Sequence, residues 1–119
     1  MKTDPQKTAA LSLDIQEGVL GLVPGALAAI SNAAQVVDFS RKSNFLLVHV
    51  GIGFEPGYPE INPRHPRFST IKDRGLFIKG PESARIHSSI YRPGDMILYK
   101  HRVSAFSGNA LQMILSARE

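Results

Sequence analysis

The 119-residue sequence contains no cysteine and no tryptophan. A chain without cysteine forms no disulfide framework and no thiolate metal site, and it carries no thiol nucleophile. No apolar run approaches the roughly 18 residues that a membrane-spanning helix requires. The first residues, "MKTDPQKTAALSL", lack the apolar core and the small-residue cleavage site of a signal peptide. We therefore expect a cytoplasmic protein with no membrane partner.

Positive charge is not concentrated in any one segment, although the formal net charge is +4. Residues 51–95 hold seven Lys/Arg and five Asp/Glu, and the rest of the chain holds the same numbers. Proteins that bind nucleic acids gather such charge into a stripe or patch that faces the phosphates. We therefore expect no nucleic-acid partner. If the chain were instead a basic nucleic-acid-binding domain, its affinity for nucleic acid would weaken steeply with increasing salt.

The first fifty residues show the pattern of a β-α-β unit. Thr8–Leu13 and Phe45–Val50 are short, mainly apolar runs, typical of strands buried on both faces. Between them, "ALAAISNAAQVVDFSRK" predicts an amphipathic helix, with Pro24 in its first turn. Its apolar stripe consists of Leu27, Ile30, Ala34 and Val37. Such a unit calls for parallel strands joined by a right-handed crossover.

Residues 51–95 form a long connection that holds six of the eight prolines and six of the ten glycines. A loop of this length is either functional or a sign of a wrong assignment. Within it, "PESARIHSSI" predicts about two helical turns that begin at Pro81 and place Ile86 and Ile90 on one face.

The remaining chain predicts one more strand and one more helix. Met96–Lys100 is a third apolar run, and "ALQMILSARE" follows, with Asn109 and Gln112 spaced as a capping pair. The order of elements indicates one α/β domain over residues 1–119, a doubly wound, Rossmann-like parallel sheet within three α-β-α layers. A dinucleotide site is not expected, because "DIQEGVLGLVPG" after the first strand lacks the G-x-G-x-x-G pattern.

Opposite charges stand at the ends of two predicted strands. Asp14 follows the first strand, and Lys100 closes the third. In open parallel sheets the carboxyl ends of the strands form the rim where ligands bind, so both side chains reach the same rim. There a carboxylate and an ammonium stabilise each other's charged form. The alternative to a functional site is an ordinary ion pair or two solvated strand ends.

An ordered set of short motifs accompanies these charges: Asp14-x-Gln16 after the first strand, "PGD" before the third, Lys100 at its end, and "SAF" at residues 104–106. In these features, and over nearly its whole length, the chain resembles the isochorismatase-like family of cysteine hydrolases. The resemblance implies an Asp-Lys-Cys site that hydrolyses a C–N amide-type or related bond in a small molecule. Asp14 would shuttle the proton and Lys100 would be its charged partner.

The resemblance also implies what is missing. The family carries its cysteine just after a fourth strand, and this sequence has no cysteine, so we expect residues 1–119 to be the N-terminal part of a larger domain, inactive by itself. The alternative is a non-catalytic family member that serves as a binding or assembly module. A homo-oligomer is implied, and no cofactor is expected.

Four further residues are predicted to bind substrate. Gln16 either orients Asp14 or is solvated in the loop. Phe54 and Tyr58, on the long connection, line a pocket or pack that connection onto the sheet. Phe106 stands over the site beside Lys100 or fills the core.

A metal site is not expected. Nicotinamidases of the resembled family bind a metal through Asp-x-His and a second histidine after the second strand, but "HVGIGFEPGYPEINPRH" contains no aspartate. His49 and His65 alone lack a carboxylate at ligand spacing. The sequence favours His49 as a core histidine with a hydrogen-bond partner.

Overall fold

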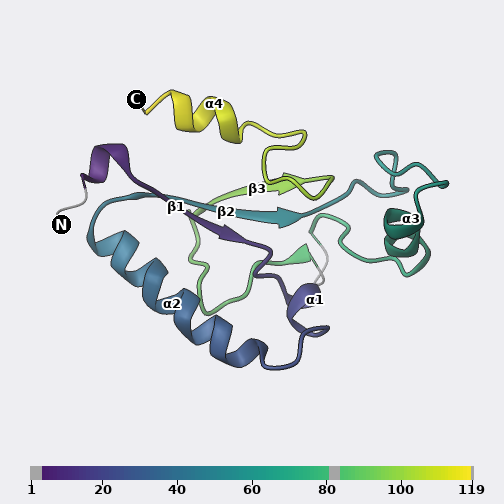
Figure 1. Ribbon diagram of the computed structural model, residues 1–119, viewed down its shortest axis with the longest axis horizontal. Helices are drawn as coiled ribbons and strands as arrows, with labels where there is room; N and C mark the ends of the chain where they lie inside the picture. Colours follow the sequence, from purple (N-terminus) through teal and green to yellow (C-terminus); the bar gives the residue numbers. More distant parts are fainter. Residues whose placement is uncertain (1–3, 81–83, 119) are drawn as a thin grey trace.

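The computed structural model describes residues 4–80 and 84–118, and it contains a three-stranded parallel sheet (Figure 1). The strands are β1 (Ala9–Leu13), β2 (Leu46–Ile52) and β3 (Met96–Lys100), in the spatial order β1-β2-β3. Leu11 of β1 is in register with Val48, and Val48 with Met96. The predicted α/β class and parallel pairing are confirmed.

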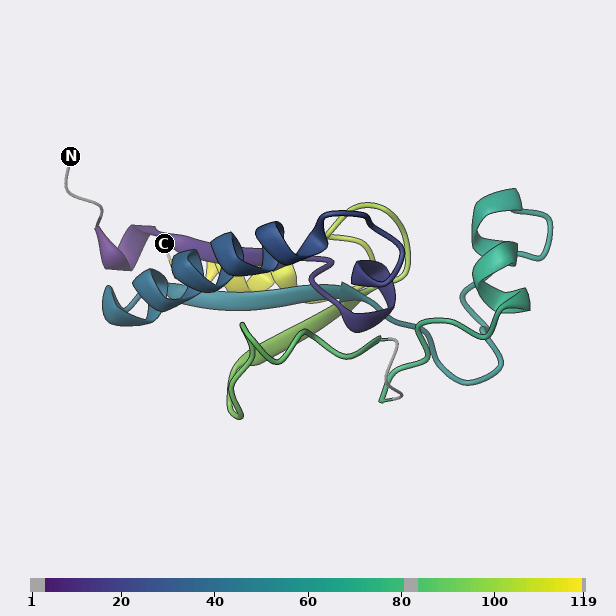
Figure 2. The same ribbon diagram turned by 90° about the horizontal axis from the view of Figure 1, so that it is seen from below.

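Helices α2 and α4 lie on opposite faces of the sheet (Figure 1, Figure 2). Successive side chains of β2 point to opposite faces, so each helix meets a different set of them. Helix α2 (Ala26–Lys42) lies on the face that carries Leu47, against which Val37 packs. Helix α4 (Leu111–Ser116) lies on the opposite face, where Leu111 packs against Val48 and Val50. The arrangement is the expected α-β-α sandwich, built around a thin sheet.

The connection after β2 has a core of its own. It contains helix α3 (Pro66–Asp73), which the sequence interpretation missed. Pro66 occupies the first helical position, and the Nδ1 atom of His65 accepts a hydrogen bond of 3.3 Å from the N–H of Phe68. Around this helix gather the buried side chains Phe54, Tyr58, Ile61, Phe68, Phe77 and Ala84. The connection is therefore a packed subregion of the domain.

The predicted helix in "PESARIHSSI" is wrong over the residues that the structure describes; residues 81–83, including Pro81, lie outside them. Ile86 forms an antiparallel bridge with Gln16, and the N–H of His87 donates to the carbonyl of Ile15 at 2.8 Å. The backbone at residues 85–87 bonds to the segment after β1, so the two continuous helical turns do not form, and only a single turn follows, in which the N–H groups of Ile90 and Tyr91 donate to the carbonyl of His87. Ile86 and Ile90 are nevertheless buried in one cluster.

Helix termini also differ from the prediction. Helix α2 is preceded by Gly25, whose φ of 76° suits glycine, so Pro24 lies before the helix. At α4 the Oδ1 atom of Asn109 accepts from the N–H of Leu111, but the amide of Gln112 faces Ser116 instead of closing a capping box. The remaining elements are a 3-10 helix η1 (Pro5–Lys7) and a short helix α1 (Glu17–Leu20).

Strand β1 is not buried on both faces, because it forms an edge of the described sheet. Leu11 and Leu13 are 37% and 48% exposed. Among the described residues, none of the helices has the length and apolar character needed to cross a bilayer.

Candidate functional site

Asp14 and Lys100 meet at the carboxyl end of the sheet. The Nζ atom of Lys100 lies 3.1 Å from Oδ1 and 3.3 Å from Oδ2 of Asp14, and it donates a further hydrogen bond of 2.9 Å to the carbonyl of Val103. The two residues belong to strands that are not neighbours, since β2 runs between β1 and β3. Two strand spacings amount to roughly 10 Å, which the long lysine side chain bridges.

The two charged side chains differ in their exposure. The Lys100 side chain is 6% exposed, whereas that of Asp14 is 37% exposed. The Oδ1 atom of Asp14 is buried and accepts no well-oriented hydrogen bond from the described residues, although Nζ lies nearby. The remainder of the Asp14 side chain is open to solvent, and an accessible carboxylate can exchange a proton with a bound molecule.

The backbone of Asp14 has a conformation that marks the end of the strand. Its N–H still donates to the carbonyl of Val50 at 2.9 Å, but its φ is 61°, in the left-handed region. Aspartate tolerates this region better than most residues do. The turn directs the carboxylate toward Lys100 at the point where β1 ends.

A family model described as the Isochorismatase domain matches residues 8–119. The chain belongs to the isochorismatase family. A comparison with curated proteins finds no match.

Solved structures show the same fold. An N-carbamoylsarcosine amidase from Thermoplasma acidophilum is similar with a TM-score of 0.72 and 27% identity, over 92% of this chain and 60% of the amidase. An isochorismatase family protein from Desulfovibrio vulgaris has a TM-score of 0.77 and 22% identity, over 94% of this chain and 62% of its own. A cysteine hydrolase from Pseudomonas syringae pv. phaseolicola has a TM-score of 0.78 and 18% identity, with coverages of 98% and 56%. The chain thus spans 56–62% of the length of these three structures.

Gln16, the other half of the Asp-x-Gln motif of this isochorismatase-family chain, is fully buried. Its Nε2 atom donates to the carbonyls of Ile52 and Ala84, both at 2.8 Å, and its Oε1 atom accepts from the N–H of Ile52 at 2.8 Å. The amide therefore ties the end of β2 and the segment after residue 83 to the end of β1. Its predicted contact with substrate stays a prediction.

The three predicted aromatic residues separate into two groups. Phe54 has no exposed surface, and Tyr58 donates its hydroxyl to the carbonyl of Leu76 at 2.8 Å, so both rings belong to the core of the long connection. Burial raises the pKa of the Tyr58 hydroxyl. Phe106 is 48% exposed, on the loop that follows Lys100. Of the three, Phe106 is the ring available to a bound molecule.

His49 and His65 have structural partners. Both ring nitrogens of His49 lie within hydrogen-bond distance, Nδ1 of Ser12 Oγ and Nε2 of Asp95 Oδ2, and His65 caps α3. This agrees with the interpretation of His49 as a core histidine. A search of the described ranges finds no group of three metal-ligating side chains of the His, Cys, Asp and Glu types.

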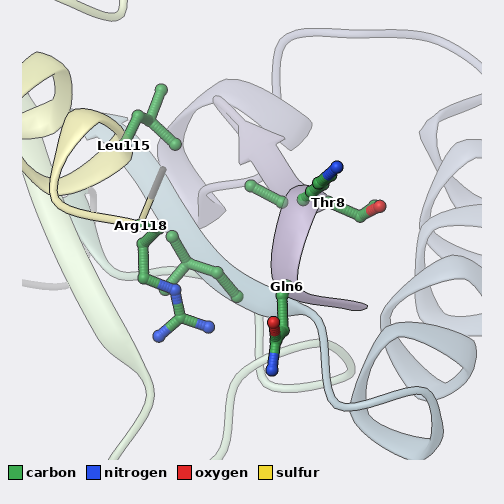
Figure 3. A pocket seen from close by; sticks show the side chains of 7 residues that line it. Gln6, Thr8, Leu115 and Arg118 are labelled. Atoms are coloured by element: carbon green, nitrogen blue, oxygen red, sulfur yellow. The ribbon is translucent and has the colours of Figure 1, made fainter. Parts of the chain in front are cut away.

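A cavity of about 270 Å³ lies where β1 begins, at the opposite end of the strand from Asp14 (Figure 3). It is lined by Gln6, Lys7, Thr8, Ala9, Leu46, Leu115 and Arg118. Neither Asp14 nor Lys100 reaches it. The candidate site is therefore the Asp14–Lys100 ion pair at the rim of the sheet, and this cavity is not part of it.

Proposed function

We propose that Asp14 and Lys100 are the acid–base part of a hydrolase site that cleaves a C–N amide-type or related bond in a small molecule. The observation that carries the proposal is their ion pair, which joins two non-adjacent strands at the rim of a parallel sheet. Ligands bind at this rim in open α/β sheets. Membership of the isochorismatase family and the likeness to a structure named an amidase support the same chemistry.

The exposure of the two residues suits different roles. The half-exposed Asp14 would accept the proton of an attacking thiol and return it to the leaving group. The buried Lys100 would stay behind it and stabilise the carboxylate and the thiolate by its charge. A cation near a cysteine lowers the pKa of the thiol and so increases the nucleophilic thiolate fraction.

In this proposal residues 1–119 are the N-terminal part of the domain, and the nucleophile reaches the site from beside β1. The crossover from β1 through α2 to β2 lies on one face, and α4 after β3 lies on the other. Since crossovers of parallel strands are right-handed, a strand that follows α4 would lie at the free edge of β1. It would place its carboxyl end next to Asp14.

The surface of β1 supports this placement. Leu11 and Leu13 are exposed along the free edge, and an apolar groove of about 210 Å³ runs between β1 and α2. Unpaired, apolar strand edges are rare in stable domains because they invite association. A further strand would cover both leucines; a homo-oligomer, also proposed, is a second way of covering apolar surface.

The intact mass of the protein purified from its native cells is the first test. A mass near 13.0 kDa would leave the site without a cysteine, and with no turnover it would favour a non-catalytic binding or assembly module. A mass near roughly 20 kDa, an ordinary single-domain size, would supply the remaining strands.

Turnover is the second test, with the native-length protein and a panel of carboxamides and N-carbamoyl amino acids. Asp14→Asn should lower kcat by at least about 100-fold, the usual contribution of a general acid–base group, and leave the Tm nearly unchanged. Asp73→Asn, at the exposed end of α3, is the matched control. Full turnover by Asp14→Asn would refute the assignment.

A further inference from the structure

A second polar cluster lies inside the sheet, apart from the ion pair at the rim. The Oγ atom of Ser12 lies 2.8 Å from Nδ1 of His49, and Nε2 of His49 lies 2.9 Å from Oδ2 of Asp95. Arg41 of α2 donates to the same Oδ2 at 2.5 Å. His49 is fully buried, and Ser12 is 8% exposed. We refer to Ser12, His49, Asp95 and Arg41 as the clamp.

The protons in the clamp follow from its charges. Burial alone would raise the pKa of Asp95, but hydrogen bonds from His49, from the N–H of Arg92 and from Arg41 outweigh it and hold that pKa below its ordinary value. The ionised carboxylate of Asp95 can accept a hydrogen bond from Nε2 of His49. The Nδ1 atom of His49 pairs with the Ser12 hydroxyl, so both ring nitrogens have a hydrogen-bond partner inside the clamp.

The clamp connects the elements that carry the ion pair. Ser12 is on β1, two residues before Asp14, and Asp95 directly precedes β3, which ends at Lys100. His49 lies between them on β2, in register with Ser12 on one side and Ile97 on the other. One chain of side-chain hydrogen bonds therefore runs from β1 through His49 on β2 to the residue that precedes β3.

The Asp14–Lys100 contact depends on this linkage because β2 separates the two strands. The distance between the charges is set by the alignment of β1 on β2 and of β3 on β2 together. A small slide of either strand would lengthen both the 3.1 Å and the 3.3 Å contacts. Side-chain bonds that span all three strands oppose such a slide.

We propose that His49, through Ser12 and Asp95, positions Asp14 against Lys100; the role as a catalytic aid rests on the function proposed above. His49 is a positioning residue here, because it touches neither charge of the pair.

The order Ser-His-Asp also matches that of a hydrolytic triad, but the surroundings of Ser12 argue against a nucleophile. The groove beside it is lined by apolar side chains from β1, β2, α2 and Ile15, apart from Ser12 itself. Ser12 is itself only 8% exposed, and this lining has no other polar side chain that could orient the polar groups of an ester or amide.

The test uses the reactivity of the Lys100 amine, measured by competitive acetylation with acetic anhydride and mass spectrometry. Ser12→Ala removes the hydroxyl that holds His49. We expect Lys100 to be acetylated about 2- to 10-fold faster, the factor that one hydrogen bond typically represents. Ser12→Thr keeps the hydroxyl and should restore the rate of the parent protein.

Ser40→Ala is the matched control. Ser40 is 2% exposed and donates to the carbonyl of Val36 within α2, outside the clamp. An equal Lys100 rate in Ser12→Ala and Ser40→Ala would overturn the proposal. Asp95→Asn gives a second measurement, because it removes the charge at the other end and should also raise the rate.

The labelling result does not depend on turnover, so it can fail or succeed separately from the proposed hydrolysis. In an active protein of native length, Ser12→Ala should lower kcat with little change in KM, since the buried Ser12 acts through His49 and not on the substrate. Unchanged kcat with faster labelling would refute the catalytic part of the inference alone.

Discussion

The amide of Gln16 occupies the space that a side chain at Gly51 would need. A Cβ atom at position 51 would lie 2.6 Å from both Cδ and Nε2 of Gln16. Both neighbours are fixed, because the amide is fully buried and makes three hydrogen bonds to backbone groups. Position 51 therefore requires glycine if the Gln16 amide is to keep its hydrogen bonds at the carboxyl end of the sheet.

Gly51→Ala should therefore displace the Gln16 amide and leave the N–H of Ile52 without its acceptor. We expect the free energy of unfolding to fall by about 2–3 kcal/mol, from lost hydrogen bonds and unpaired buried groups. Urea denaturation measures this change. Gly21→Ala is the control, since its Cβ would meet only the carbonyl of Glu17 at 3.6 Å, and its stability should stay within about 0.5 kcal/mol. Equal stabilities would contradict the steric argument.

Phe54 and Phe106 should behave oppositely when each is truncated. Phe54→Ala removes a fully buried ring and should cost about 3–5 kcal/mol of unfolding free energy. Phe106→Ala removes a ring that is 48% exposed, and its effect on stability should be under about 1 kcal/mol. In a protein with turnover, only Phe106→Ala should raise KM without loss of fold. A marginal change in the unfolding free energy of Phe54→Ala would contradict its role in the core and favour its role in binding substrate.

Asp95 should make folding stability sensitive to acid. Its pKa is below the ordinary value in the folded state, so the carboxylate contributes stability that is present above the unfolded-state pKa and is lost as pH falls through the folded-state pKa. The unfolding free energy of Asp95→Asn should consequently vary less with pH below about 4 than that of the parent protein. Thermal unfolding across the acid range tests this. Identical pH profiles for both proteins would show that the hydrogen bonds to Asp95 do not favour its charged form.

The free edge of β1 should make the isolated 119-residue chain associate. Leu11 is 37% exposed there, and Leu11→Lys places a charge on the edge, which opposes strand pairing. Sedimentation velocity over a range of concentrations should show less self-association for this variant. Leu22→Lys changes a residue that is 61% exposed but lies outside the sheet, and it should associate like the parent chain. Association that responds only to Leu22→Lys would locate the contact elsewhere.

The three strands and the two charged residues of the candidate site could be located from the amino-acid sequence alone. Short apolar runs located β1, β2 and β3, because runs of this length bounded by turn residues are typical of buried strands and are shorter than most helices. Asp14 and Lys100 could be placed at one rim, since parallel strands present their carboxyl ends together.

The contacts between these elements became visible in the folded chain and could not be read from local patterns. Helix α3 was missed because its start is capped by a histidine, a residue outside the common capping set, although Pro66 was a usable signal. The segment at Ile86 has a helix-like pattern, yet its backbone pairs with Gln16. The separation of Asp14 and Lys100, the burial of Gln16 against Gly51 and the clamp around His49 all depend on which strands adjoin. Spatial neighbours far apart in sequence are chosen by packing and backbone pairing, and local patterns do not encode them.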